Sequence, residues 1–427
     1  MTDIARPILF TAAALSDSRF LIDEPAAMLL SPGEDRHVLA SGRLNEVVGH
    51  PVAASAHRID VPDSILIPGL ANAHTHLDLT HIGPLPFDSR AGFRSFIDAV
   101  RSRRCTEPAA IERSVRLGAA LLRNSGTVAV GDIAGAVKGL PALVASDALK
   151  SAGVIGVSYI EFFAMSASGP ELIRDIESLI SGASMADSPL KLGLQPHAPY
   201  SVSPRSYAAA IALGSKLNLP VCTHLAETPE EVEFIARGTG PLRQLLESLG
   251  VWHPELETEF GRDESPVAHV VGRFGNPRNV VHVNHCSNDD METLKSADSN
   301  VIYCPRSSDY FGWSHVFGPH RYQDMMKAGI NIALGTDSII NLPQHDRISV
   351  LDEMRFLHAR DSVSPQTLLA MATVNVARTL GIPADRGLFR TDAAPLGVLA
   401  IRIDGSSDPM GQIMRNNEQP RMLWSRW

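Results

Sequence analysis

Two histidines separated by a single residue are the first feature of this sequence that could do chemistry. His74 and His76 follow the aliphatic run Ile65-Leu66-Ile67, which is typical of a β-strand. Because side chains alternate along a strand, both imidazoles would project from one face. Neutral imidazole is a good ligand for Zn²⁺, and a catalytic zinc keeps one position open for water. The pair predicts part of a metal site, against the alternative that a polar strand end carries two histidines by chance.

Similar side chains recur at the ends of short apolar segments further along the chain. They are His197 after residues 191–196, His224 and Glu227 at the end of 220–224, His285 at the end of 280–285, and Asp337 after 330–334. If these segments are neighbouring strands of one parallel barrel, their carboxyl ends meet at one rim. Imidazoles and carboxylates gathered there would serve both metal binding and general acid–base catalysis.

The elements that would position these side chains follow a repeated order of strand, loop and helix. After the first strand, the strand candidates are residues 127–133, 154–162, 191–196, 220–224, 280–285, 300–303 and 330–334. Ser203, Thr228 and Ser364 each precede a proline, a combination that is typical of a helix start. Eight such units predict a (β/α)₈ TIM barrel over residues 65–387, with its chemistry at the carboxyl ends of the strands.

The two ends of the chain have a different pattern. Residues 1–64 contain the short strand candidates 8–15, 27–30 and 37–41, separated by turn residues, and residues 388–427 contain the apolar run 396–401. We expect both ends to form one small β-sandwich beside the barrel.

Composition excludes several classes of protein. Of the 427 residues, 44% are hydrophobic and 20% are charged, which is typical of globular proteins. The net charge of −9 offers no basic surface for nucleic acid, and no apolar stretch approaches the ~20 residues of a membrane span. The four cysteines have no C-x-x-C spacing, which fits a reduced protein of the cytoplasm. The expected partner is a small-molecule substrate, and a homo-oligomer stays open.

The residues at these strand ends resemble the amidohydrolase superfamily, and three motifs indicate a group within it. They are His-Thr-His-Leu-Asp at residues 74–78, His-Ala-Pro-Tyr-Ser-Val-Ser at 197–203 and Cys-Pro-Arg-Ser at 304–307. Within that superfamily the chain resembles the mononuclear metal-dependent aminohydrolases, and it looks most like the aminofutalosine-deaminase-like group. The resemblance covers nearly the whole chain, and its specificity lies in the combination of motifs.

The resemblance implies roles for individual residues. The implied metal ligands are His74, His76, His224 and Asp337, and the implied catalytic groups are Glu227 as acid and base, His285 beside the attacking water, and Asp337. Binuclear relatives carry a lysine where this chain has Gln195-Pro196-His197, so we expect one divalent ion, Zn²⁺ with Fe²⁺ as the alternative. His282 lies three residues before His285, and we expect it on the opposite face of the strand.

The substrate would be held at the same rim. The residues expected to contact it are His197, Asp78 and Arg306. Asp132 and Glu161 lie at the ends of strands two and three, and their role could be either hydrogen bonding within the rim or contact with the substrate. The long excursions 78–107 and 235–278 are expected to cover the mouth of the barrel, because segments of this length usually serve as lids or binding loops.

The function expected from these features is hydrolytic deamination of an aminated heterocycle, purine-like or an adenine-bearing nucleoside such as aminofutalosine. One alternative is hydrolysis of another C–N or a C–halogen bond, as in triazine hydrolases. A second alternative, from another class, is a metal-free binding protein on the same barrel. The second would be marked by the loss of a metal-ligating histidine, and the sequence keeps all of them.

Overall fold

The computed structural model describes residues 5–166, 168–183, 188–405 and 407–427. The chain divides into two compact units. One comprises Met1–Asn72, Ala120–Val130 and Asp346–Trp427, and the other Ala73–Ala119 and Gly131–His345. The domain limits expected at residues 64 and 387 stay a prediction.

Eight parallel strands form the barrel sheet. In sequence order they are β6 (Leu70–Thr75), β7 (Thr127–Ala134), β8 (Gly156–Phe162), β9 (Leu190–Pro196), β10 (Val221–Leu225), β11 (Arg278–His282), β12 (Asn300–Tyr303) and β13 (Asn331–Leu334), and they lie in this order in the sheet. The sheet closes between its first and last members, because Thr75 bridges to Asp337 and the Asp337 N–H donates to the His74 carbonyl at 3.1 Å. The expected (β/α)₈ TIM barrel is confirmed.

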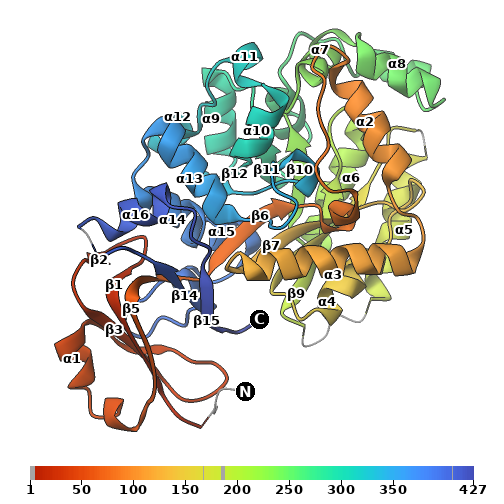
Figure 1. Ribbon diagram of the computed structural model, residues 1–427. Helices are drawn as coiled ribbons and strands as arrows, with labels where there is room; N and C mark the ends of the chain where they lie inside the picture. The colour runs from red at the N-terminus through yellow and green to blue at the C-terminus, as the bar shows by residue number, and fades with distance from the viewer. Residues whose placement is uncertain (1–4, 167, 184–187, 406) are drawn as a thin grey trace. The chain divides into compact units, whose positions relative to one another are not determined.

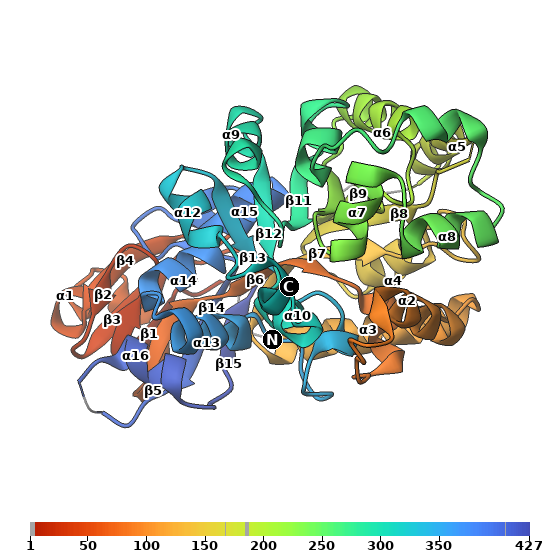
Figure 2. The same ribbon diagram turned by 90° about the horizontal axis from the view of Figure 1, so that it is seen from above.

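Helices follow the barrel strands. They are α3 (Pro108–Asn124), α4 (Val144–Ser151), α5 (Gly169–Ser181), α6 (Pro204–Leu217), α7 (Pro229–Arg237), α9 (Asn288–Ser296), α12 (Tyr322–Lys327), α13 (Val350–Asp361), α14 (Pro365–Met371) and α15 (Val374–Leu380). Helices α4 and α6 pack on strands β8 to β10 (Figure 2). The expected caps are present, since Ser203, Thr228 and Ser364 each accept a backbone N–H from three residues onward. No helix within the described parts of the chain is long and apolar enough to cross a lipid bilayer.

The strands of the two chain ends belong to one sheet. They are β1 (Ile8–Ser16), β2 (Leu21–Ile22), β3 (Ala26–Leu30), β4 (Val38–Arg43), β5 (His57–Pro68), β14 (Gly397–Arg402) and β15 (Arg421–Ser425), with short helices α1 (Leu44–Val48) and α16 (Pro409–Arg415). Figure 1 shows the blue strands β14 and β15 beside β5, in the order β15-β14-β5-β1-β3-β4. Strands β1 and β5 pair in parallel, and the other pairs are antiparallel. The two ends fold together as expected, and their strands hydrogen-bond into one mixed sheet.

The two excursions contain helices of their own. Helix α2 (Gly92–Arg103) comes from the first, α8 (Pro241–Ser248) from the second, and the two lie side by side in both views (Figures 1 and 2). Together with α10 (Pro305–Phe311) and α11 (Ser314–Phe317), they cover one apolar cluster. Its members include Phe93, Leu242, Leu245, Phe311 and Trp313.

A chain of polar side chains crosses the interior of the barrel. The Tyr159 hydroxyl of β8 accepts from Asn279 at 3.1 Å, Asn279 accepts from Asn300 at 2.8 Å, and Asn300 accepts from Asn331 at 3.0 Å. Strands β9 and β10 separate β8 from β11, so the first bond spans the barrel. Gly193 on β9 makes room, because a Cβ there would lie 2.5 Å from the tyrosine ring. We call these four residues the polar ladder, and it satisfies buried groups that would otherwise be costly.

Candidate metal centre and active site

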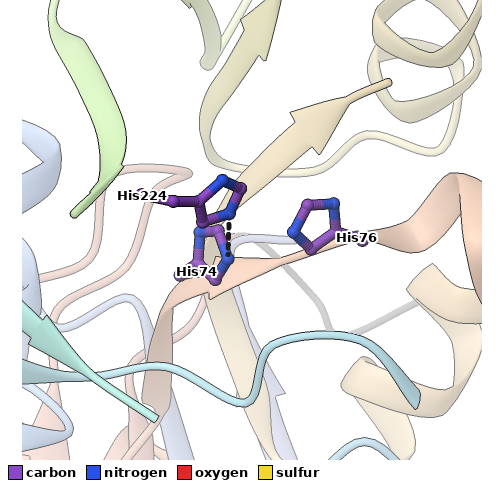
Figure 3. A group of neighbouring side chains, drawn as sticks. All are labelled: His74, His76 and His224. Carbon is purple, nitrogen blue, oxygen red and sulfur yellow. Dashed lines mark hydrogen bonds between the residues drawn. The ribbon is translucent and has the colours of Figure 1, made fainter. Parts of the chain in front are cut away.

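Three buried imidazoles meet at the carboxyl ends of β6 and β10. His74 and His76 come from β6 and the turn after it, His224 comes from β10, and their candidate ligand atoms all lie within 4.8 Å of one another. The Nε2 atoms of His74 and His224 face each other at 3.3 Å (Figure 3). Two N–H groups could not approach in this way, so at least one of these nitrogens presents a lone pair.

The environment keeps the imidazoles of His76 and His224 neutral. Burial, followed by the neighbouring His74, lowers the pKa of His76 to about 3, and burial holds the pKa of His224 well below its ordinary value. His224 Nδ1 lies 3.0 Å from the His197 carbonyl, so it donates there and leaves Nε2 with its lone pair. Neutral imidazoles with converging lone pairs fit a divalent ion such as zinc.

Asp337 supplies a carboxylate to the same cluster. It follows β13 in a left-handed backbone conformation (φ 57°), which aspartate tolerates better than most residues. Its Oδ1 lies 3.6 Å from His76 Nε2 and 3.8 Å from His74 Nε2. Its Oδ2 accepts from Ser307 at 2.7 Å and from Asn341 at 2.8 Å. The carboxylate is therefore fixed in orientation as the fourth candidate ligand.

A clamped turn positions Glu227 between β10 and α7. Ala226 has a left-handed backbone (φ 51°), which is strained for a residue with a Cβ. The Glu231 carboxylate holds this turn, accepting the Ala226 N–H at 2.7 Å and the Glu227 N–H at 2.9 Å. On the other side, the Asn284 amide donates to the Glu227 carbonyl at 3.0 Å. The backbone of Glu227 is thus held from both directions.

The surroundings of Glu227 favour the protonated form of its carboxyl group. Its side chain lines the site and is 7% exposed. Burial raises its pKa well above the ordinary value, and the Asp337 carboxylate raises it further. A carboxyl group whose pKa is raised beside a nucleophile site is suited to general acid catalysis.

The histidine that joins this cluster from β11 is His282. The strand ends at His282, and its ring stacks on His224 with centroids 5.4 Å apart and lies 5.9 Å from the His74 ring. The expected strand end at His285 is wrong, and so is the expectation that His282 faces away. His282 and Val283 both have positive φ (74° and 52°), which breaks the alternation on which that expectation relied.

His285 lies apart from the cluster. It is in the loop that follows β11, its ring contacts Phe317 with centroids 5.3 Å apart, and it is not among the described residues that line the cavity. The structure therefore brings His282, and not His285, beside the candidate metal ligands.

The cluster forms one end of a cavity of about 630 Å³. The polar groups at that end are His76, His197, His224, Glu227, His282 and Asp337. Much of the remaining wall is apolar and comes from the two excursions, with Phe93, Phe96, Ile97 and Val100 from α2 and Leu242, Leu245, Leu246, Leu249 and Val251 from α8 and its sequel. The cavity is larger than a single heterocycle requires, so there is room for a substituent.

Arg104 is a residue of this wall that the sequence did not single out. It follows α2, and its guanidinium pairs with Asp78 at 3.0 Å and with Glu161 at 3.2 Å. Burial is the largest single influence and would raise the pKa of Glu161, but Arg104, His197, His76 and the Ala136 N–H together hold that pKa below its ordinary value. Arg104 and Glu161 line the cavity, whereas Asp78 lies behind Arg104. The only advance signal for Arg104 was its place in the first excursion.

Of the other residues expected at the rim, some line the cavity and some do not. His197 lines the cavity, and its Nδ1 lies 2.8 Å from the Ser201 hydroxyl. Arg306 is not among the described lining residues, and its guanidinium donates to Gln344 at 3.2 Å. Asp132 accepts the Leu77 N–H at 2.9 Å, so it supports the turn after His76. Neither Arg306 nor Asp132 is brought to the cavity.

Comparison with known proteins agrees with this geometry. The model of the Amidohydrolase family matches residues 65–394. An aminodeoxyfutalosine deaminase of Deinococcus radiodurans is 28% identical over 355 residues, covering 78% of this chain and 80% of that protein. A 5-methylthioadenosine/S-adenosylhomocysteine deaminase of Pyrococcus furiosus is 27% identical over 358 residues, covering 81% and 77%.

A solved structure shares the fold. It is an adenosine deaminase of Xanthomonas campestris with bound zinc, which superimposes with a TM-score of 0.72 at 19% identity. The match covers 98% of this chain and 91% of that one.

Proposed function

The chain belongs to the amidohydrolase family, and from this premise we propose that it is a metal-dependent deaminase that releases ammonia from a purine-like heterocycle. The observation that carries the proposal is the grouping of Glu227 and His282 with three buried imidazoles and Asp337 at one end of a cavity. A metal-free binding protein would have no use for this combination of ligands and acid.

The metal in this proposal is a single divalent ion, for which we propose zinc. His74, His76, His224 and Asp337 would hold it. When bound, such an ion lowers the pKa of water and so supplies a nucleophile at neutral pH. The zinc in the Xanthomonas campestris structure supports the choice of metal.

The residues of the chain would manage the protons. Water adds to the ring carbon that bears the amine, a C–O bond forms, and the C–N bond then breaks to release ammonia. Glu227, whose pKa is raised by burial, would donate its proton to the ring nitrogen during addition. Its carboxylate would then take up a proton from the added water and pass it to the departing amine, and a second proton from the same water would restore the acid as the C=O bond forms. Asp337 would accept a hydrogen bond from the attacking water, and His282 would stabilise the charge that develops at the tetrahedral carbon.

The substrate class in this proposal is an adenine-bearing nucleoside, with aminodeoxyfutalosine and 5-methylthioadenosine as candidates. The names of the two curated relatives support it, and so does the space beyond the metal ligands. The C–halogen alternative is not favoured, because the curated relatives are deaminases. A cytoplasmic location stays a prediction, and oligomeric state stays open.

The test is a screen for ammonia release. Purified protein loaded with zinc would be incubated with aminated purines, pterins, pyrimidines and their nucleosides. We expect ammonia from one or more adenine-bearing compounds. Release of halide from chlorinated triazines without ammonia from any amine would contradict the proposal.

A further inference from the structure

The backbone carbonyl of His282 is held by a second histidine, His320. This residue lies between α11 and α12, in the segment that connects β12 to β13, and its Nε2 lies 2.8 Å from the His282 oxygen. Its Nδ1 accepts the Tyr322 N–H at 3.0 Å. A carbonyl oxygen can only accept, so the proton of the neutral imidazole is on Nε2 and His320 donates to His282.

Two tyrosine rings fix the orientation of the His320 imidazole. The ring of Tyr303, the last residue of β12, stacks on it with centroids 3.8 Å apart and an interplanar angle of 19°. The ring of Tyr322, the first residue of α12, lies 6.0 Å away, and both tyrosines are buried. His320 is not among the described residues that line the cavity, so any effect on the reaction would pass through His282.

The peptide bond after His282 is held at both of its polar atoms. Its carbonyl accepts from His320, and its N–H, which belongs to Val283, donates to the Leu225 carbonyl at 3.0 Å. The two residues that it joins have φ of 74° and 52°. Residues with a Cβ keep such conformations only where the surroundings enforce them. His320 does so from the β12 side of the strand, and β10 does so from the other side.

The backbone held in this way sets the direction of the His282 side chain. Asn279 points into the barrel, so regular alternation along β11 would turn the side chain at position 282 outward. The left-handed φ of His282 rotates its Cβ away from that direction. The ring then lies 5.4 Å from the His224 ring, and its Nε2 lies 3.8 Å from Glu227 Oε1.

We propose that His320 is a positioning residue of the deamination reaction. By donating to the His282 carbonyl, it keeps the His282 ring beside the candidate metal ligands and Glu227. This inference rests on the proposed function, because turnover is the quantity that the position of His282 would change. A displaced ring would stabilise the developing charge less, whereas the rest of the cavity would still bind substrate. Loss of the hydrogen bond should therefore lower kcat and leave KM nearly unchanged.

Substitutions at position 320 separate the hydrogen bond from the packing of the ring. His320→Phe keeps the stack on Tyr303 and removes the donor, and we expect kcat to fall roughly 10- to 100-fold, the scale of a lost orienting contact. His320→Asn keeps an acceptor for the Tyr322 N–H but is too short to reach the carbonyl, and it should lose as much. His320→Gln should retain most of the wild-type kcat, because its amide nitrogen can take the place of Nε2.

The neighbouring residue Arg321 provides a matched control. Its guanidinium donates to the Cys286 carbonyl at 3.1 Å, in the same loop but beyond the site. Arg321→Met removes this bond and should keep the wild-type kcat. A loss as large as that of His320→Phe would mean that general loosening of the loop, and not the position of His282, sets the rate.

A double-mutant cycle tests whether His320 acts through His282. In the His282→Asn background, His320→Phe should change kcat by no more than about twofold, because the side chain that it positions is absent. The activity is ammonia release by zinc-loaded protein from adenosine, 5′-methylthioadenosine and aminodeoxyfutalosine. Zinc content should stay unchanged in every variant, and melting temperature establishes that each is folded. If His320→Phe does not fold, His320→Asn takes its place in the cycle.

The outcomes distinguish this inference from the proposed function. Losses that multiply in the double variant, or a His320→Gln variant as slow as His320→Phe, would overturn the positioning role and leave deamination intact. No ammonia from any of the three compounds with wild-type enzyme would overturn both proposals.

Discussion

Among single residues, Glu227 is the one on which proton transfer depends in the proposed reaction. Its carboxyl is buried beside Asp337 and is no candidate ligand of the histidine cluster. We expect Glu227→Gln to keep its metal and to lose about 10²–10⁴-fold in turnover, because only general acid–base catalysis is removed. Elemental analysis and ammonia release measure the two quantities. Loss of the metal in this variant would make Glu227 a ligand instead.

The two histidines near the end of β11 allow a sharper comparison. His282 stacks on His224, whereas His285 packs on Phe317. We expect His282→Asn to keep the metal and to lose roughly 10²–10³-fold in turnover, the scale of one preorganised electrostatic contact. His285→Asn is the matched control and should stay close to the wild-type rate. The opposite ranking of the two variants would return the role to His285.

The histidines of the site show which placements could be predicted from the sequence and which could not. His74 and His76 were correctly brought together, because β6 is regular and alternation places both on one side. The placement of His282 was missed because His282 itself and Val283, two consecutive non-glycine residues, have left-handed backbone conformations. The dipeptide His282-Val283 does not indicate a left-handed backbone, since the residues that usually adopt this conformation are glycine and asparagine.

At the scale of elements, the turn between β10 and α7 is held by a carboxylate that titrates. Burial raises the pKa of Glu231 from its ordinary 4.5 to about 7, although three backbone N–H groups oppose the shift. Between about pH 4.5 and 7 the folded protein therefore binds more protons at this site than the unfolded chain does. The contribution of Glu231 to the free energy of unfolding must fall as pH rises through that window.

The variant Glu231→Gln tests whether the contribution of Glu231 to the free energy of unfolding falls as pH rises. The amide cannot accept both backbone N–H groups, so the variant should be less stable than wild type by about 1–3 kcal/mol at low pH. That difference should shrink as pH rises from 5 to 7.5, because only wild type loses the proton. Urea unfolding of both proteins in the presence of a chelator measures the difference in their free energies of unfolding. Glu233→Gln on the same helix serves as the control. A difference that is constant with pH would contradict the raised pKa.

Elements were predicted from sequence more accurately than their mutual contacts. The caps Ser203 and Thr228 were found because a capping hydroxyl before proline is a local signal. The pairing of Arg104 with Asp78 and Glu161 joins residues 26 and 57 positions apart, and no periodicity marks such a contact. It is decided by tertiary packing around Gly135.

For the molecule as a whole, the proposed metal joins strands from distant parts of the chain. His74, His224 and Asp337 come from β6, β10 and the end of β13, so their ligation would act on the folded state alone. We expect about one zinc-sized ion per chain and about 4 kcal/mol of added stability when free metal is a thousand times its Kd. A chelator should lower the melting temperature of wild type, and His224→Ala should melt at the lower temperature with or without it. Two tightly bound ions per chain would contradict the single-metal site.

The polar ladder has a consequence for how such a chain can be divided. The Tyr159 hydroxyl meets Asn279 across 120 positions of sequence, so a fragment that stops after β10 would bury that hydroxyl without its partner. An orphaned buried group costs about 1–3 kcal/mol, which is a large part of the stability of a typical domain. A chain emerging from the ribosome would meet the same penalty until β11 is available. Half-barrels cut from this protein should therefore be poor autonomous folding units, and recombination with other barrels would need to carry β8 and β11 together.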